Sequence, residues 1–357
     1  MSLTTDRQEW QSRRALPNDP VWILVLAGGR GRRLAGFVRT TLCDTRPKQF
    51  CHILGRRSMI RHTWDRAVRL VPAERLVTII TAGQERYVAQ EARSCGRIPG
   101  RVLVQPADRG TGPGLLLPLL WIARQQPDAT AVVFPADQFV WEESRFLAHV
   151  ADAVIESRRR PDRVVLLGVE PDRPETSYGW ITPGVPRVGR LPNRELFAVA
   201  DFVEKPDAAR ARQLQAAGGL WHTCVMAGTV FAFLQLARRT QPDALSVLET
   251  VTGNFGTSAA GAAIAQAYGR VPAFDVARDM LARERDALLV QPARGLTWAD
   301  WGDANRILET VARIGQRPAW SAAAPRTLSG LHREAWIATA ASVRHTGRLL
   351  DTDHHIG

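Results

Sequence analysis

Apolar runs alternate with amphipathic segments over the first half of the chain. Val21 to Leu26 is an unbroken apolar run, typical of a strand that is buried on both faces. Similar runs and helical periodicities predict further elements. The predicted strands are 76–81, 102–105, 131–134 and 164–169, and the predicted helices are 59–70, 85–94, 115–124 and 144–159. This alternation predicts an α/β fold with a mostly parallel sheet covered on both faces.

The pattern changes after Glu170, where proline and glycine become frequent. We expect an antiparallel insertion lying across the sheet, followed by a mixed C-terminal part. Its predicted strands are 197–203, 224–233 and 288–291, with a strand and turn at 295–301, and its predicted helices are 207–217, 233–239, 279–284 and 304–314. The domain boundaries predicted from this reading are a tail at 1–20, a main domain at 21–315 and an extension at 316–357 containing a helix at 331–343.

Charge and composition narrow the function classes. The 357 residues contain 47 Lys or Arg and carry a formal net charge of +12, but the basic residues are scattered and no nucleic-acid-binding motif is visible. We therefore expect an anionic small substrate and no nucleic acid. The four cysteines lack C-x-x-C spacing, residues 1–20 lack the apolar core of a secretory signal, and no apolar run is long enough to span a membrane. These features predict a cytoplasmic protein without a membrane segment.

Only two of the basic residues are lysine, Lys48 and Lys205. Arginine has been used nearly everywhere that either residue would serve. A lysine that persists against this bias suggests a site where a compact ammonium is required and a planar guanidinium does not fit. Both lysines fall inside candidate motifs, R-P-K-Q-F and F-V-E-K-P.

Glycines and basic residues follow the first predicted strand. Ala27, Gly28, Gly29 and Gly31 form a loop that lets backbone approach a ligand closely, and Arg33 and Lys48 follow it. The loop lacks the Gly-Lys-Ser/Thr of a Walker A loop and the third glycine of a dinucleotide fingerprint. Ligands of parallel sheets bind at the carboxyl ends of the strands, so Gln105 and Asp137, which follow two further strands, are expected at the same crevice.

Carboxylates complete the predicted chemistry. Asp137 and Asp300 could hold Mg²⁺ together with phosphate oxygens and waters; the sequence keeps Asp303 open as a competitor of Asp300. No serine, cysteine or histidine triad stands out. These parts suit nucleotidyl transfer, in which an anionic phosphate oxygen is the nucleophile and the protein supplies alignment and charge neutralisation.

Eight segments in order resemble the sugar-phosphate nucleotidyltransferases, and most closely the bacterial mannose-1-phosphate guanylyltransferases. They are L-A-G-G-R-G-R-R-L, R-P-K-Q-F, Q-P-A-D-R-G-T-G-P-G, F-P-A-D-Q-F-V, G-V-E-P-D-R-P-E-T-S-Y-G-W-I, F-V-E-K-P-D, W-H-T-C-V-M-A-G and L-T-W-A-D-W-G-D. The resemblance implies a Rossmann-like, GT-A-like catalytic domain at 21–315. It also implies conversion of GTP and α-D-mannose 1-phosphate to GDP-mannose and pyrophosphate.

The resemblance also implies a role for each matching residue. For the nucleotide, Ala27, Gly28, Gly29 and Gly31 would cradle the phosphates, Arg33 and Lys48 would neutralise them, and Gln105 and Thr111 would lie at the guanine and ribose. For the sugar phosphate, Tyr178 and Gly179 would line the pocket, Glu204 would accept hexose hydroxyl protons, Lys205 would bind the phosphate, and His222 would touch a sugar hydroxyl. Asp137 and Asp300 would hold Mg²⁺.

Two departures from the family pattern keep alternatives open. His222 stands where the family has asparagine, so another nucleotide and hexose 1-phosphate pair, such as glucose 1-phosphate, remains a candidate substrate pair. The stretch between Leu34 and Pro47 lacks the usual proline-led sequence, so the loop over the triphosphate is expected to differ. A catalytically silent regulatory homologue is the alternative from another class. The sequence does not give the oligomeric state, and a homodimer stays one option.

Overall fold

The structure, a computed structural model, describes residues 20–96, 98–187 and 195–322. Within these residues the chain divides into two compact units. Unit 1 contains residues 20–29, 63–136 and 142–296, and unit 2 contains residues 30–62, 137–141 and 297–322. The predicted main domain of 21–315 is therefore divided between the two units, and the predicted helix at 331–343 lies outside the described residues.

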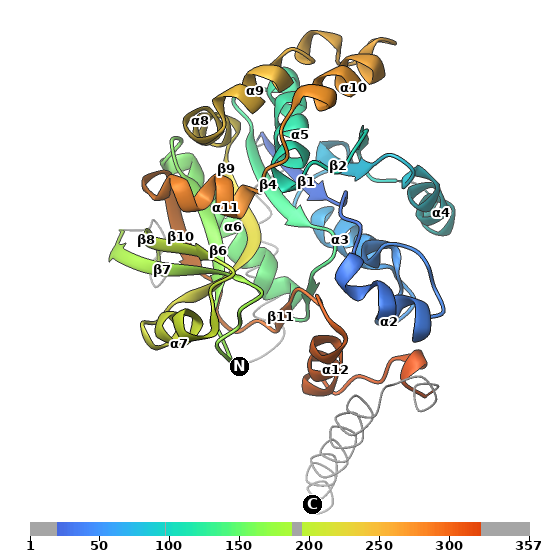
Figure 1. Ribbon diagram of the computed structural model, residues 1–357, viewed down its shortest axis with the longest axis vertical. Helices are drawn as coiled ribbons and strands as arrows, with labels where there is room; N and C mark the ends of the chain where they lie inside the picture. Colours follow the sequence, from blue (N-terminus) through green and yellow to red (C-terminus); the bar gives the residue numbers. More distant parts are fainter. Residues whose placement is uncertain (1–19, 97, 188–194, 323–357) are drawn as a thin grey trace, which may run out of the picture. The chain divides into compact units, whose positions relative to one another are not determined.

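Unit 1 is built on one sheet, which has nine strands among the described residues (Figure 1). In spatial order they are β3 (Arg101–Gln105), β2 (Leu76–Thr81), β1 (Val21–Leu26), β4 (Thr130–Pro135), β9 (Leu220–Thr229), β6 (Val164–Val169), β10 (Leu288–Pro292), β8 (Phe197–Glu204) and β7 (Gly179–Pro186). The first four are parallel to one another, and β6 is parallel to β10, whereas β9, β8 and β7 pair antiparallel with their neighbours. The predicted α/β fold is confirmed.

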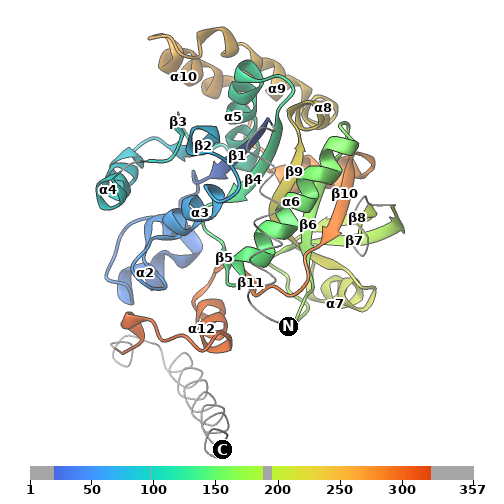
Figure 2. The ribbon, with the colours of Figure 1, turned by 180° about the vertical axis from the view of Figure 1, so that it is seen from behind.

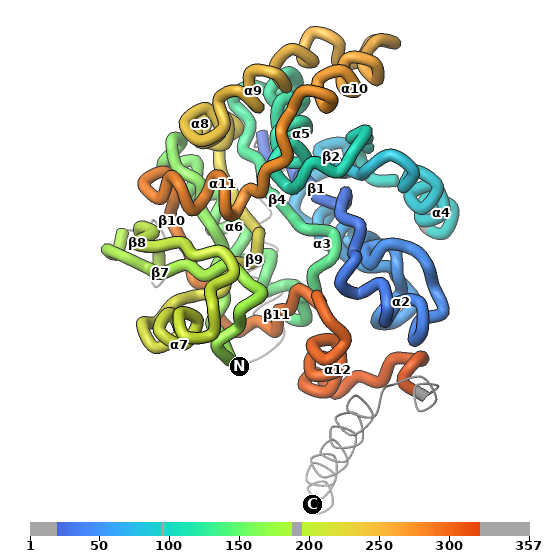
Figure 3. Tube along the Cα trace, viewed as in Figure 1, coloured from blue at the N-terminus to red at the C-terminus, as the bar shows by residue number. Residues whose placement is uncertain are grey.

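The sequence suggested that the antiparallel strands lie across the sheet, and this prediction is wrong. β9 forms hydrogen bonds with both β4 and β6, so the strands after Glu170 extend the same sheet. The tube in Figure 3 follows this path from β7 through β8 and α7 (Ala208–Ala216) into β9. Buried backbone groups need hydrogen-bond partners, and insertion into the sheet supplies them on both sides of β9.

Helices cover both faces of the sheet. Side chains alternate along a strand, so Leu24 and Val133 face a core shared with one set of helices, whereas Phe134 faces the other side. There Phe134 contacts Phe146 of α6 (Glu143–Arg159), with ring centroids 5.5 Å apart, and α6 runs over β4, β6 and β9 (Figure 2). The helices of the first face are α5 (Thr111–Gln125), α8 (Val230–Thr240), α9 (Pro242–Glu249), α10 (Ala260–Arg270) and α11 (Val276–Asp279).

Unit 2 has its own core. α2 (Ala35–Thr40) and α12 (Ala304–Arg313) supply apolar side chains to it, and β5 (Phe139–Val140) pairs antiparallel with β11 (Trp298–Ala299). Trp301 stacks on Phe139 with ring centroids 4.4 Å apart. α3 (Met59–Ala67) contributes Met59 to this core and continues into unit 1, where α4 (Glu85–Cys95) also lies.

Several predicted boundaries are wrong for identifiable reasons. The strand predicted at 224–233 ends at Thr229, because the Thr229 hydroxyl accepts a hydrogen bond from Ala232 N and caps α8. The helix predicted at 279–284 is replaced by α11, whose N-cap is Asp275, followed by a 3₁₀ turn at Leu281–Arg283. Strand β7 and helices α9 and α10 were not predicted.

Two other helices have shifted ends. α5 begins at Thr111 and not at Leu115, so it includes two glycines that the sequence assigned to a loop. α3 ends at Ala67 and not at Leu70. Among the described residues, no helix combines the length and the apolar character that crossing a membrane requires.

Candidate active site

The glycine loop of unit 1 lies at the carboxyl edge of the parallel strands. Leu26 at the end of β1 pairs with Ile79 of β2 and Pro135 of β4, and Thr81 at the end of β2 pairs with Gln105 of β3. The ends of these strands therefore meet at one edge, as the sequence predicted for the glycine loop and Gln105.

Side chains from the neighbouring strand fix the backbone of this loop. The Thr81 hydroxyl donates to the Gly28 carbonyl at 2.8 Å, and Gln84 Nε2 donates to the Gly29 carbonyl at 3.1 Å. A Cβ on Gly28 would lie 2.5 Å from Gln105 Nε2, so this position requires glycine. Thr81 and Gln84 were missed by the sequence reading, because no local pattern marks a side chain that bonds to a loop so far away in the chain.

Gln105, predicted to lie at the guanine, is only 3% exposed and is held at both ends of its amide. Its Nε2 donates to the Thr81 hydroxyl at 2.9 Å, and the Tyr268 hydroxyl lies 3.1 Å from its Oε1. Burial raises the pKa of Tyr268, so its hydroxyl stays a proton donor. Thr81 gives its own proton to Gly28, and this chain of donors fixes which way the Gln105 amide faces.

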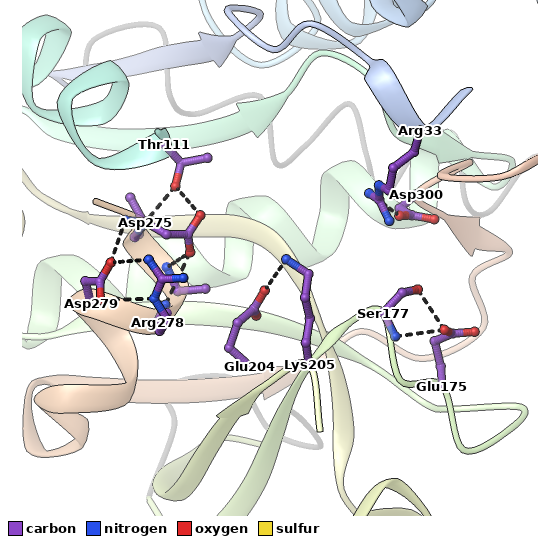
Figure 4. A network of polar contacts seen from close by, with 12 residues as sticks. Arg33, Thr111, Glu175, Ser177, Glu204, Lys205, Asp275, Arg278, Asp279 and Asp300 are labelled. Carbon is purple, nitrogen blue, oxygen red and sulfur yellow. Dashed lines mark hydrogen bonds and ion pairs between the residues drawn. The ribbon is translucent and has the colours of Figure 1, made fainter. Parts of the chain in front are cut away.

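Thr111, predicted to lie at the ribose, starts α5 and bonds to another part of unit 1. Its hydroxyl donates to Asp275 Oδ2 at 2.9 Å and accepts from Val276 N at 2.9 Å (Figure 4). Gly112, the next residue of α5, packs tightly on Phe274, because a Cβ there would lie 2.0 Å from that ring. Asp275 was not singled out from the sequence; its position before a short helical segment was the available signal.

The residues predicted for the sugar come together in a second part of unit 1. Gly179 on β7 is paired with Glu204 on β8, and a Cβ on Gly179 would lie 2.7 Å from Glu204 Oε2. Tyr178 is buried and meets Trp221 edge to face, with centroids 5.1 Å apart. Because Gly179 has no side chain, the Glu204 carboxylate has space beside it.

Glu204 and Lys205 form an ion pair, with Lys205 Nζ 3.1 Å from Glu204 Oε1 (Figure 4). Burial raises the pKa of Glu204, and the neighbouring ammonium partly opposes this shift. Lys205 itself is 59% exposed and adopts the left-handed backbone conformation, with φ +50°. Residues held in that conformation without being glycine often lie at functional sites.

His222 lies on β9 next to a bulge. The register of β9 against β6 shifts between Leu166 and Gly168, Cys224 has φ +58°, and the Thr223 hydroxyl donates to the Leu167 carbonyl at 2.7 Å. Such a bulge redirects the neighbouring side chains. The His222 ring meets Phe202 edge to face at 5.1 Å.

Burial lowers the pKa of His222 to about 4, and the Asp275 carboxylate only partly opposes this shift. The ring is therefore neutral near pH 7. Its Nδ1 is buried and has no hydrogen-bond partner among the residues that the structure describes. A neutral imidazole can offer a hydroxyl one donor and one acceptor.

The predicted phosphate and metal residues of unit 2 also form one cluster. Lys48 Nζ lies 3.0 Å from Asp137 Oδ2, 2.5 Å from the Asp300 carbonyl and 3.3 Å from the Trp301 carbonyl. Arg33, which is 62% exposed, reaches Asp300 Oδ2 at 3.4 Å. Gly31, with φ +60°, lets the loop pass Lys48, since a Cβ there would lie 3.0 Å from Lys48 N.

The two competing aspartates have different surroundings. Asp303 is the N-cap of α12 and accepts a hydrogen bond from Arg306 N at 3.0 Å. Asp300 Oδ1 accepts from Gly302 N at 2.9 Å in a tight turn, next to Arg33 and Lys48. Asp300 is thus the aspartate that belongs to the cluster.

The carboxylates of this cluster suit magnesium. The described residues contain no group of three or more His, Cys, Asp or Glu able to enclose an ion. Asp137, 43% exposed, and Asp300 surround one ammonium and offer two carboxylates. Mg²⁺ characteristically takes one or two protein carboxylates and fills its shell with phosphate oxygens and water, so these residues fit that ion.

The class of protein follows from this fold and these residues. The chain belongs to the nucleotidyl transferase family, whose model matches residues 23–317. Among curated proteins it is similar to mannose-1-phosphate guanylyltransferase of Escherichia coli K12, with 28% identity over 297 residues covering 82% of this chain and 60% of that protein. It is similarly related to the xanthan biosynthesis protein XanB of Xanthomonas campestris pv. campestris, with 27% identity and the same coverage. The chain thus spans about 60% of the length of these relatives.

Solved structures of other proteins are also similar to this chain. A protein described as mannose-1-phosphate geranyltransferase from Thermus thermophilus superposes with a TM-score of 0.69 and 27% identity, covering 82% of this chain and 79% of that one. Mannose-6-phosphate isomerase from Helicobacter pylori, at 15% identity and a TM-score of 0.60, shares the fold. The resemblance found in the sequence is confirmed.

Proposed function

We propose that the chain transfers GMP from GTP to α-D-mannose 1-phosphate, forming GDP-mannose and pyrophosphate. The observation that carries the proposal is the cluster of Arg33, Lys48, Asp137 and Asp300, which combines two cations with two carboxylates in unit 2. The name of the Escherichia coli K12 relative, mannose-1-phosphate guanylyltransferase at 28% identity, supports the substrate pair.

The reaction needs no nucleophilic side chain. An anionic phosphate oxygen of the sugar phosphate attacks the α-phosphorus of the nucleotide, and the bond from that phosphorus to the pyrophosphate oxygen breaks. When bound, Mg²⁺ would neutralise charge on the phosphates. Arg33 supplies a solvent-accessible cation for the same purpose, and Gly28 and Gly29 bring backbone close to the nucleotide.

We assign the sugar phosphate to the group of residues in unit 1 that contains Glu204 and Lys205. Lys205 meets its phosphate, Glu204 accepts protons from hexose hydroxyls, and Tyr178 and Gly179 line the space beside them. Loss of one charge contact in such a site raises the barrier by about 3–4 kcal/mol. Lys205→Met would then reduce kcat/KM by roughly 100-fold or more.

A panel of nucleoside triphosphates and sugar 1-phosphates, read by pyrophosphate release with Mg²⁺, tests the proposal. GTP with mannose 1-phosphate should give the highest kcat/KM. A clear preference for a different pair would reject the substrate assignment, and no release with any pair would favour the silent homologue.

A second candidate, another nucleotide and hexose 1-phosphate pair, is motivated by His222. An asparagine side chain offers an amide donor and a carbonyl acceptor on one planar group, whereas a neutral imidazole offers them on opposite sides of a ring. His222 would therefore bond a sugar hydroxyl with a different geometry from the amide of the family pattern. The hexose arm of the same panel, with glucose 1-phosphate included, separates the two candidates.

A further inference from the structure

Arg278, on α11, carries hydrogen-bond donors that the described part of the chain does not use. Its guanidinium is held in a fork, because Nε donates to Asp279 Oδ1 at 3.1 Å and Nη2 donates to Asp279 Oδ2 at 2.9 Å. A guanidinium has five N–H groups, so three remain, and these have no hydrogen-bond partner among the described residues. The side chain is 67% exposed, so a ligand can reach these donors.

Asp279 fixes the orientation of the fork. Its side chain is 13% exposed, and its Oδ2 also accepts a hydrogen bond from Asp275 N at 2.8 Å. Hydrogen bonding to Asp279 raises the pKa of Arg278, and the carboxylates of Asp275 and Glu204 add to this shift. The guanidinium is therefore oriented before a ligand binds, which reduces the entropy lost on binding.

Glu204 provides an acceptor that complements these donors. α11 contacts β8, and Figure 4 shows Asp279, Arg278, Glu204 and Lys205 from left to right in one part of unit 1. Lys205 pairs with Oε1 of Glu204, whereas Oε2, beside Gly179, has no hydrogen-bond partner among the residues that the structure describes. A hydroxyl both donates and accepts a hydrogen bond, so one hydroxyl can bond to Glu204 Oε2 and to Arg278 together.

The charges around Arg278 favour a hydroxyl over a phosphate as its ligand. The carboxylates of Asp275, Asp279 and Glu204 all interact with the guanidinium, and they would repel a phosphate dianion. Lys205, in contrast, is 59% exposed and pairs with one carboxylate, that of Glu204. The phosphate therefore belongs with Lys205, and a neutral part of the sugar belongs with Arg278.

We propose that Arg278 determines sugar specificity by donating a hydrogen bond to one hexose hydroxyl, whose proton Glu204 accepts. The inference rests on the proposed function, which makes a hexose 1-phosphate the ligand of this part of unit 1. Arg278 lies outside the eight sequence segments that resemble the family. The contact is therefore a feature of this chain that those segments do not contain.

Binding of sugar phosphates by calorimetry tests the role of Arg278 without turnover. The ligands are mannose 1-phosphate and its monodeoxy analogues, with Mg²⁺ and a GTP analogue whose α,β-bridging oxygen is a methylene, so that no transfer occurs. In wild type, the analogue that lacks the recognised hydroxyl should bind roughly tenfold more weakly than mannose 1-phosphate. In Arg278→Gln, mannose 1-phosphate itself should bind roughly tenfold more weakly, and most of the difference between it and that analogue should disappear.

Arg283→Gln is the matched control. Arg283 Nη2 lies 3.6 Å from the same Asp279 Oδ1, and its side chain is 60% exposed, so this variant removes a positive charge beside Asp279 without removing the fork. All ligands should bind to it as they bind to wild type. Both arginines are exposed, so both variants should keep the wild-type Tm. Arg278→Lys, which keeps the charge but not the fork, should show the same loss of discrimination as Arg278→Gln.

Two results would overturn the role of Arg278. Equal weakening of mannose 1-phosphate and of every deoxy analogue by Arg278→Gln would show a contact with the phosphate, and unchanged binding would show no contact with the ligand. If wild type binds mannose 1-phosphate but releases no pyrophosphate from any substrate pair, the proposed function fails, whereas the binding comparison still decides the role of Arg278. If wild type binds no hexose 1-phosphate, the sugar assignment and this role fail together.

Discussion

Gly28→Ala is predicted to disrupt the nucleotide edge of unit 1. The new Cβ would lie 2.5 Å from Gln105 Nε2 and 3.1 Å from the Thr81 hydroxyl, and an ordinary contact requires a shift of about 1 Å. Gln105 is buried and cannot shift by this amount while keeping its bonds to Thr81 and Tyr268. Losing these bonds and leaving a buried amide unsatisfied destabilises the fold by about 2–4 kcal/mol.

The measurement is thermal unfolding, followed by nucleotide titration. A loss of that size should lower Tm by roughly 5–15 °C and raise the KM for the nucleotide more than the KM for the sugar phosphate. Gly29→Ala is the matched control, because a Cβ there meets nothing within 4 Å, and its Tm should stay close to wild type. Equal Tm values for Gly28→Ala and wild type would refute the close packing of Gln105 against the loop.

Three further predictions concern the remaining residues. Lys205→Arg should lower kcat/KM for the sugar phosphate despite the retained charge, because a planar guanidinium does not replace the compact ammonium beside Glu204; wild-type kinetics would remove the argument for a required ammonium. Asp303→Ala should lose about 1 kcal/mol of stability through its cap and keep turnover, whereas Asp300→Asn should lose turnover; the reverse pattern in unfolding and rate assays would exchange their roles. The pKa of His222 is about 4 in the folded protein and 6.5 in the unfolded chain, so the free energy of unfolding decreases as pH falls from 6.5 toward 4. Between pH 7 and pH 5 the free energy of unfolding of wild type should decrease by about 2 kcal/mol more than that of His222→Asn. An equal pH dependence of the two unfolding free energies would contradict the burial of His222.

The sequence predicted the framework of unit 1 well because its signals are local. β1, β2 and β6 have the predicted bounds, since short runs of buried β-branched and aliphatic residues mark fully enclosed strands. The end of β9 could not be read in this way. The apolar run continues through Thr229 into α8, and only the hydrogen bond from Ala232 N to the Thr229 hydroxyl marks the change from strand to helix.

The parts of the site that escaped prediction depend on partners distant in the chain. Tyr268 orients Gln105 from α10, and Asp275 bonds to Thr111 from the start of α11. No spacing or composition connects such pairs, because the sheet and its helices create their proximity. Motif positions in a sequence identify candidate side chains, and the fold determines which hydrogen bonds those side chains have already made.

The two lysines show why this distinction matters. The same compositional signal marks both, yet Lys48 is 5% exposed with three acceptors inside unit 2, whereas Lys205 is 59% exposed and paired with its sequence neighbour Glu204. A phosphate can reach an exposed ammonium held by one carboxylate, because that ion pair is weak and exchanges readily in water. To reach the ammonium of Lys48, a phosphate oxygen would have to displace at least one of its three internal acceptors. The same compositional signal therefore marks two different surroundings in one chain: an accessible ammonium at Lys205 and an ammonium with three internal acceptors at Lys48.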